Sequence, residues 1–123
     1  MVTIPSKNLA IRRRGRDHIS ELALVVINQL KKVSIESSYQ PLLSITRKVK
    51  DQSGLNSQQR SENIKGAYLV KNSLIPQGEV ILIDDLITTG SSIQEGIRAL
   101  KAAEIAVSAV TTACAVGRNS LIR

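Results

Sequence analysis

Two adjacent carboxylates, Asp84 and Asp85, follow a short apolar run and precede a turn rich in hydroxyl groups. Residues 80–83 form the β-branched apolar run that is typical of a strand buried on both faces, as parallel strands are. We therefore expect the two carboxylates at the carboxyl end of a strand. In open α/β sheets, ligands bind at that edge.

The turn that follows places hydroxyl side chains around a glycine, directly before an amphipathic helix. Its residues are Thr88, Thr89, Gly90, Ser91 and Ser92. A glycine allows close approach of the backbone to a ligand, and a helix N-terminus offers free N–H groups and a partial positive charge to a phosphate. The order of strand, acidic pair, turn and helix therefore predicts a ribose-phosphate pocket.

Each fragment alone also has a purely structural interpretation. An acidic pair at a strand end is often a solvated turn, and Ser92 with Glu95 three residues later has the spacing of a capping box, which needs no ligand. The contiguous order is more specific than either fragment. Two competing phosphate-binding motifs, G-x-x-x-x-G-K-S/T and G-x-G-x-x-G, are absent from the sequence.

The composition allows one domain and limits its partners. The chain has 123 residues, of which 42% are hydrophobic, and this is enough for the core of one domain spanning residues 1–123. Its net charge is +7, and the basic excess lies entirely in residues 1–78. A positive surface attracts nucleic acid or polyphosphate, and charge alone does not separate the two. Because Tyr39 and Tyr68 are the only aromatic residues, a stacking surface for single-stranded nucleic acid is disfavoured.

The single cysteine, Cys114, cannot form an internal disulfide or a cysteine-based zinc cluster. It lies in an apolar run, and we expect it to be a small core residue. No apolar run approaches membrane-spanning length, and the first residues lack a signal-peptide hydrophobic region. We therefore expect a cytoplasmic protein without membrane contact.

Hydrophobic periodicity predicts alternating strands and helices. We expect a helix that begins after Asp17 and carries an apolar stripe from Ile19 to Leu30, and a second helix over residues 92–103. Strands are expected over residues 2–5, 42–49, 67–70, 79–83 and 107–116. This alternation implies an α/β fold with a mainly parallel sheet flanked by helices. The polar residues 50–65 are too many for a simple connection, and we expect a mobile loop that acts as a lid.

The segment from residue 80 to residue 93 resembles the phosphoribosyl-pyrophosphate (PRPP) motif of type I phosphoribosyltransferases. The resemblance implies that Asp84 and Asp85 are catalytic, since they would receive the ribose 2- and 3-hydroxyls and offset positive charge on the ring. It also implies that the turn wraps the 5-phosphate. The turn has Gly-Ser-Ser where the family often has Gly-Gly-Thr or Gly-Ala-Thr, and a serine hydroxyl can still donate to phosphate.

Other segments resemble the ComF-type members of that family. They are Ile4-Pro5, the run Arg14-Gly15-Arg16-Asp17-His18-Ile19, and the central positions Asp51-Gln52, Leu55, Arg60, Asn63 and Gly66-Ala67-Tyr68. Arg16, Asp17 and Glu104 depart from the family pattern, and the last stands where a glycine is common after the helix. Family members usually carry a cysteine-rich zinc segment ahead of this domain, and we expect it to be absent here.

The same resemblance assigns basic side chains to the leaving pyrophosphate and to a lid over the substrate. These side chains are Arg12, Arg13, Arg14, Arg16, Arg47 and Arg60. Guanidinium groups suit phosphate oxygens, although composition alone favours a solvated charge run for the first four. The only histidine, His18, is expected to be a surface helix residue rather than a proton shuttle.

The expected protein is a phosphoribosyltransferase that binds PRPP with Mg²⁺, transfers the phosphoribosyl group to an unidentified acceptor and releases pyrophosphate. Substrate oxygens and water would hold most of the Mg²⁺ coordination sphere, with Asp84 or Asp85 acting through water. The alternatives are a competence-associated protein of DNA uptake that retains the pocket and a regulatory RNA-binding module on the same fold. Nucleic acid, competence proteins and a second copy of the chain are the partners left open.

Overall fold

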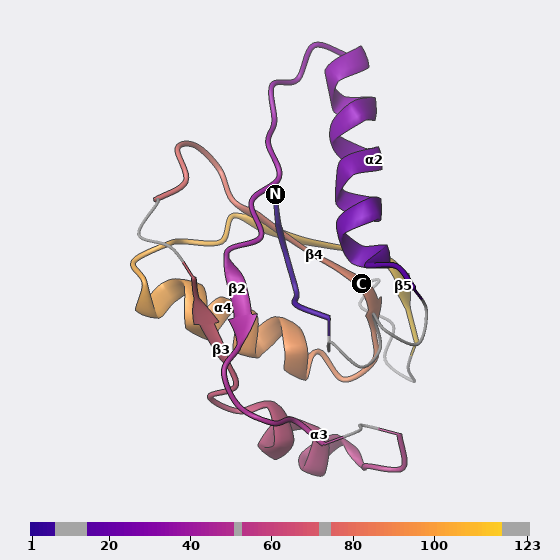
Figure 1. The fold of residues 1–123 in the computed structure, drawn as a ribbon, viewed down its shortest axis with the longest axis vertical. Helices are drawn as coiled ribbons and strands as arrows, with labels where there is room; N and C mark the ends of the chain where they lie inside the picture. Colours follow the sequence, from indigo (N-terminus) through magenta and orange to yellow (C-terminus); the bar gives the residue numbers. More distant parts are fainter. Residues whose placement is uncertain (7–14, 51–52, 72–74, 117–123) are drawn as a thin grey trace.

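The computed structural model describes residues 1–6, 15–50, 53–71 and 75–116 (Figure 1). Strands and helices alternate along this part of the chain. In order they are β1 (Val2–Thr3), α2 (His18–Lys32), β2 (Leu43–Ile45), α3 (Ser57–Ile64), β3 (Tyr68–Val70), β4 (Ile81–Ile87), α4 (Ser91–Ala102) and β5 (Ala109–Ala115).

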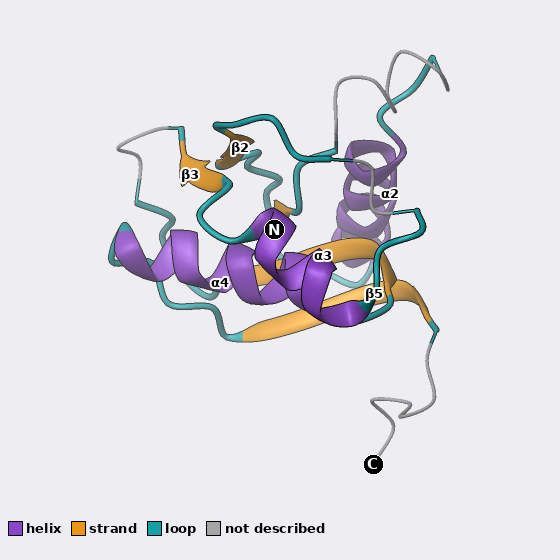
Figure 2. Ribbon diagram, turned by 90° about the horizontal axis from the view of Figure 1, so that it is seen from below, coloured by secondary structure: helices purple, strands orange, loops and turns teal. Residues whose placement is uncertain are grey.

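The sheet that carries the acidic pair is parallel. β4 lies between β1 and β5, with Leu82 opposite Val2 and Asp84 opposite Thr112. β2 and β3 form a separate antiparallel pair, and Figure 2 shows α4 between this pair and the parallel sheet. The predicted α/β fold with a mainly parallel sheet flanked by helices is therefore confirmed. The difference is that β2 and β3 are short and bury one face against α4 instead of extending the parallel sheet.

α4 approaches both sheets closely because it carries a glycine on its buried face. A Cβ atom on Gly96 would lie 2.7 Å from Ile4 Cδ1, 3.2 Å from Leu82 Cδ2 and 3.4 Å from Leu43 Cδ1. Leu82 and Leu100 are fully buried in the same cluster. A side chain at position 96 would force neighbours to move, since atoms essentially never approach a Cβ within 3.0 Å.

α2 begins where it was predicted, directly after Asp17, but only part of its apolar stripe is buried. Ile19 and Ala23 pack with Ile83 of β4 in a second, smaller cluster. The other stripe residues, Leu22, Val26, Ile27 and Leu30, are partly buried, whereas Leu24 and Val25, which lie outside the stripe, are 50% and 55% exposed. Among the described helices, none has the length and apolar character needed to cross a membrane.

A chain of hydroxyl groups connects β1 to the start of α2. Thr3 Oγ1 lies 3.1 Å from Tyr39 Oη, which lies 2.7 Å from Ser20 Oγ, and Ser20 donates to Asp17 Oδ2 at 2.7 Å. The Asp17 side chain therefore accepts from a side chain and makes no cap hydrogen bond to the backbone of α2. These bonds fix the first turn of α2 beside the end of β1.

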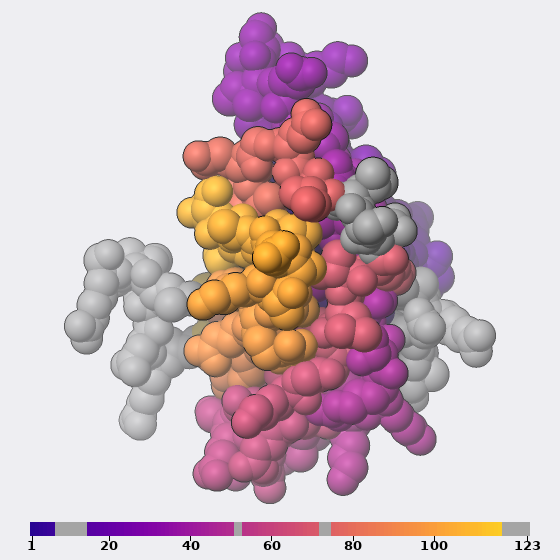
Figure 3. Space-filling model, turned by 90° about the vertical axis from the view of Figure 1, so that its left-hand side faces the viewer, coloured from indigo at the N-terminus to yellow at the C-terminus, as the bar shows by residue number. Residues whose placement is uncertain are grey.

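The polar segment 50–65 is not a continuous loop, because its second half forms α3. Asn56 begins the helix with a capping box: it accepts from Gln59 N at 2.8 Å, and its own N–H donates to Gln59 Oε1 at 3.0 Å. Ile64 is buried in the main core, and α3 packs against α4, as Figure 3 shows with α3 in rose below α4 in orange. The expectation of an unpacked segment is wrong for these residues, and the Asn-x-x-Gln spacing is a sequence signal that would have predicted the helix.

Two strand predictions also differ from the structure. β4 does not end before Asp84, because β5 continues to pair with it as far as Ile87 opposite Ala115. Cys114 is exposed, so its predicted place in the core is wrong. The reason is that β5 is an edge strand in the described part of the chain, and none of its residues is buried.

Both long helices end in Schellman motifs without glycine. After α4, Glu104 N–H donates to Lys101 O at 2.9 Å and Ile105 N–H donates to Leu100 O at 2.9 Å, with Glu104 at φ 61°. After α2, Ser34 has φ 60° in the equivalent position. Left-handed backbone is unfavourable for residues with a Cβ, so each end carries conformational strain.

Replacing Glu104 with glycine should therefore increase stability. We expect Glu104→Gly to raise the free energy of unfolding by about 1 kcal/mol, because glycine adopts the left-handed conformation without the Cβ penalty. Urea unfolding followed by circular dichroism measures this change. The control is Glu104→Ala, which removes the carboxylate and keeps the strain. Equal stability of the two variants would contradict the role assigned to the backbone.

Candidate functional site

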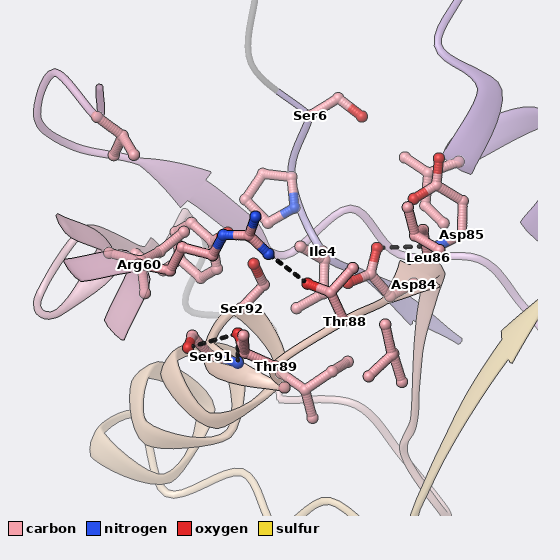
Figure 4. A pocket seen from close by; sticks show the side chains of 18 of the residues that line it. Ile4, Ser6, Arg60, Asp84, Asp85, Leu86, Thr88, Thr89, Ser91 and Ser92 are labelled. Atoms are coloured by element: carbon pink, nitrogen blue, oxygen red, sulfur yellow. Dashed lines mark hydrogen bonds between the residues drawn. The ribbon is translucent and has the colours of Figure 1, made fainter. Parts of the chain in front are cut away.

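A cavity of about 450 Å³ opens where β1 and β4 meet the N-terminus of α4 (Figure 4). The structure places most of the sequence-predicted site residues on its wall. They are Asp84, Asp85, Thr88, Thr89, Gly90, Ser91, Ser92, Arg16 and Arg60. The predicted acidic pair and the predicted phosphate-binding turn therefore face the same space.

Residues 88–92, called the hydroxyl turn below, connect β4 to α4. Gly90 is the N-cap of α4 and adopts the left-handed conformation with φ 79°. It has no side chain that could cap the helix, and the N–H of Ser91 makes only a long contact of 3.4 Å with Thr89 Oγ1. Thr89 Oγ1 lies 2.9 Å from Ser91 Oγ, which orders the hydroxyl groups next to the open helix end. A helix N-terminus without a cap, surrounded by hydroxyls, is suited to an anion.

The expected capping box of Ser92 and Glu95 does not form. α4 begins one residue earlier, and Glu95 turns into the core, where it is 5% exposed. Glu95 accepts from Tyr68 N at 3.1 Å and from Arg98 at 2.7 and 2.8 Å, while Arg98 Nη2 donates to Tyr68 O at 2.9 Å. Glu95 and Arg98 of α4 thus bind both the N–H and the C=O of one residue in β3.

This arrangement keeps Glu95 ionised. Burial alone would raise the pKa of Glu95, but hydrogen bonds from Arg98 and from the backbone of Tyr68 and Gly66 outweigh it and lower the pKa below its usual value of 4.5. The same pairing raises the pKa of Arg98. A carboxylate with a lowered pKa stabilises the folded state above its unfolded pKa, and this stabilisation is lost as the pH falls through the folded value.

We predict that Glu95→Gln lowers the free energy of unfolding by about 1.5–3 kcal/mol at pH 7, the usual contribution of a hydrogen bond to a charged group. The loss should shrink on acidification, because below the usual pKa of 4.5 the unfolded chain gains a proton at Glu95 and the ionised folded form loses its advantage. Urea unfolding at pH 7 and at pH 3.5 measures both effects. The control is Glu62→Gln on the exposed side of α3, which should change stability by less than about 0.5 kcal/mol. A loss that stays the same at both pH values would contradict the ionic role of Glu95.

Asp84 is the more buried member of the acidic pair. It is 8% exposed, and its Oδ1 accepts from the N–H of Asp85 at 2.9 Å. Burial, together with a hydrogen bond and the charge of Asp85, raises the pKa of Asp84 from 3.8 to about 7. A desolvated carboxyl group that titrates near neutral pH beside a like charge is typical of a functional site.

The raised pKa makes Asp84 a source of pH-dependent instability. The folded state favours the protonated form, so the stability that this group contributes is complete below pH 3.8 and is lost as the pH rises to about 7. Asp84→Asn keeps the shape and removes the titration. We therefore expect the melting temperature of Asp84→Asn, relative to the unmutated protein, to increase between pH 4 and pH 8. The exposed Glu79→Gln serves as control, and a difference that does not vary with pH would refute the assignment.

The predicted arginines do not all reach the cavity. Arg16 lines it and is exposed, and Arg60 lies opposite the hydroxyl turn with Nη1 3.4 Å from Thr88 Oγ1. Arg47 is not on the wall, because its Nη2 donates to Asn63 O at 2.9 Å and to Lys65 O at 2.6 Å. Arg12, Arg13 and Arg14 lie outside the described residues.

Tyr68 is a wall residue to which the sequence assigned no role. Tyr68 is 2% exposed and shares the cavity wall with Ser92 of the hydroxyl turn. Burial raises the pKa of Tyr68 to about 12, since the Ser92 side chain only partly opposes burial and the neighbouring carboxylates Asp84 and Glu95 add to it. The hydroxyl therefore stays protonated at neutral pH. A single tyrosine in an apolar strand carries no sequence signal for this position.

The carboxylates on the cavity wall are those of the acidic pair. Within the described ranges, no cluster of three or more His, Cys, Asp or Glu side chains is placed to hold a metal ion. Mg²⁺ prefers oxygen ligands and usually keeps several waters, so one or two carboxylates beside a phosphorylated substrate suffice to bind it. The site thus fits an ion that is coordinated largely by its substrate.

Comparison with known proteins identifies the family. The family model described as Phosphoribosyl transferase domain matches residues 9–122, which include the acidic pair and the hydroxyl turn. The chain therefore belongs to the phosphoribosyltransferase family, and its α/β fold is that of the type I members. No curated protein and no solved structure matches the chain. The family predicted from the sequence is confirmed, while the ComF subtype stays a prediction.

Proposed function

We propose that the protein binds PRPP with Mg²⁺ in the cavity and transfers its phosphoribosyl group to an acceptor, with release of pyrophosphate. One observation carries this proposal: an acidic pair, of which Asp84 is buried, and a helix N-terminus surrounded by hydroxyls line the same 450 Å³ cavity. The first suits a diol and a developing positive charge, and the second suits a phosphate. A ribose ring phosphorylated at its 5-position presents both groups at once.

In this proposal, the ribose lies between β4 and α4. Asp84 and Asp85 accept hydrogen bonds from the 2- and 3-hydroxyls. Residues 88–92 surround the 5-phosphate with hydroxyl and backbone N–H donors, and Gly90 leaves room for its oxygens. Holding the sugar at both ends orients C1 toward the open part of the cavity, where an acceptor can approach.

The reaction exchanges one bond at C1 for another. The bond between C1 and the pyrophosphate oxygen breaks, its electron pair leaves with pyrophosphate, and a lone pair of the acceptor forms the new bond to C1. The acidic pair offsets positive charge that develops on the ring, and Arg16 offsets negative charge on the departing group. When bound, Mg²⁺ supplies further neutralisation of the pyrophosphate charge.

A basic chain could instead use the fold to bind nucleic acid, as a competence-associated or regulatory protein would. The two functions differ in what they require of the cavity. Transfer requires the acidic pair and PRPP, whereas nucleic-acid binding would depend on salt and tolerate substitution of that pair. The experiment below separates them.

We predict that PRPP with Mg²⁺ stabilises the protein through the cavity. Ligand at a hundred times its dissociation constant should add about 2.7 kcal/mol to the free energy of unfolding, which is a clear rise in melting temperature. Asp85→Asn should remove most of that rise while the ligand-free variant stays folded, because Asp85 is only partly buried. The control is the exposed Glu79→Gln, which should respond like the unmutated protein. Absence of any shift at millimolar PRPP would refute the proposal, and release of pyrophosphate in an acceptor screen would complete it.

A further inference from the structure

Arg60 projects from α3 across the cavity toward the hydroxyl turn. Figure 4 shows its guanidinium group directed at Thr88, with Nη1 3.4 Å from Thr88 Oγ1. This position is fixed by packed structure, because the capping box of Asn56 and Gln59 holds one end of α3 and buried Ile64 holds the other. Arg60 is therefore presented to the cavity by a helix that is anchored in the core through Ile64.

The guanidinium of Arg60 lacks sufficient partners in the described part of the chain. Its Nε is buried and has no hydrogen-bond partner there, and its contact with Thr88 is longer than the 2.7–3.2 Å of an ordinary N–H···O bond. The ion pairs between described residues involve Glu21 and Glu95, so none neutralises Arg60. A buried donor without a partner is unfavourable, and an arginine carries five N–H donors. A bound anion would satisfy this group.

The place of that anion follows from the charges around Arg60. On one side lie the hydroxyl turn and the open N-terminus of α4, which attract negative charge. Asp84 and Asp85, also on the cavity wall, repel it. An anion that contacts Arg60 is therefore best placed between the guanidinium and the hydroxyl turn, away from the acidic pair.

We propose that Arg60 binds the 5-phosphate directly, and that the phosphate site consists of the hydroxyl turn on one side and Arg60 on the other. This inference rests on the proposed function for the identity of the substrate. It assigns Arg60 to the phosphate on the sugar rather than to the pyrophosphate or a closing lid. A fixed guanidinium fork favours a phosphate monoester over an unphosphorylated sugar, because it can donate two parallel hydrogen bonds to phosphate oxygens.

Titration calorimetry with separate parts of the substrate tests this assignment. Ribose 5-phosphate probes the phosphate site, and pyrophosphate with Mg²⁺ probes the other anionic group. The variants are Arg60→Gln, which removes the charge, and Arg60→Lys, which keeps the charge without the fork. Lys101→Gln removes one positive charge from an exposed position of α4 and controls for the overall field of the protein. Circular dichroism and thermal melting establish that each variant is folded.

Arg60→Gln should weaken ribose 5-phosphate about 10- to 100-fold, as expected for a lost charge-assisted hydrogen bond, and change pyrophosphate by less than about 2-fold. Arg60→Lys should fall between Arg60→Gln and the unmutated protein, and it carries the test if the glutamine variant does not fold. Lys101→Gln should bind both ligands as the unmutated protein does. Unchanged affinity for ribose 5-phosphate in both Arg60 variants overturns the inference, and so does a greater loss of pyrophosphate affinity.

Failure of this inference is distinguishable from failure of the proposed function. If ribose 5-phosphate binds through Arg60 while PRPP never yields pyrophosphate with any acceptor, the phosphate site stands and the transferase reaction fails. If PRPP is turned over and neither Arg60 variant changes ribose 5-phosphate affinity, the transferase stands and the inference fails. If the unmutated protein binds neither ribose 5-phosphate nor inorganic phosphate, the phosphate site is overturned.

Discussion

Two hydrogen bonds, from the Tyr68 N–H to Glu95 and from Arg98 to the Tyr68 carbonyl, join the two sheets of this protein through one helix. α4 lies on the parallel sheet by its apolar face, and these two side chains attach the antiparallel pair to the same helix. Because Tyr68 also contacts Ser92, the attachment reaches the hydroxyl turn at the start of α4. The contacts of Glu95 and Arg98 with Tyr68 therefore help to position both the Tyr68 side of the cavity wall and the N-terminal end of α4.

The cavity combines opposite electrostatic requirements at short range. Asp84 is desolvated next to a second carboxylate, which is unfavourable for the folded protein, while the hydroxyl turn and Arg60 lack the negative partners that would satisfy them. A molecule that carries a diol at one end and a phosphate at the other relieves both conditions at once. Under the proposed function, unrelieved charge on both walls would favour binding of a phosphorylated sugar.

The acidic pair and the hydroxyl turn could be predicted from the sequence because their arrangement is local: strand, turn and helix follow one another without interruption. Glu95 could not be placed in this way, since the residue that competes for it, Tyr68, is distant in sequence and becomes a neighbour only after the sheets meet α4. The extent of β4 likewise depends on its pairing with β5, and the exposure of Cys114 depends on β5 being an edge. Arg47 was predicted at the substrate, but nearby carbonyl groups bind it instead.

The absence of a Cβ atom at Gly96, inside the core, helps to set the shape of the cavity at the surface. A methyl group there would meet Ile4, Leu82 and Leu43, which come from the two sheets and from the segment that follows β1. Ile4 also lines the cavity, so pushing it outward would move one wall, while lifting α4 would move the hydroxyl turn on the other. The width of the cavity therefore depends on how closely α4 packs against the two sheets at Gly96. Substitutions that improve the intrinsic helix propensity of α4 at this position would therefore change the spacing between the acidic pair and the hydroxyl turn, to which the proposed function assigns the sugar and its phosphate.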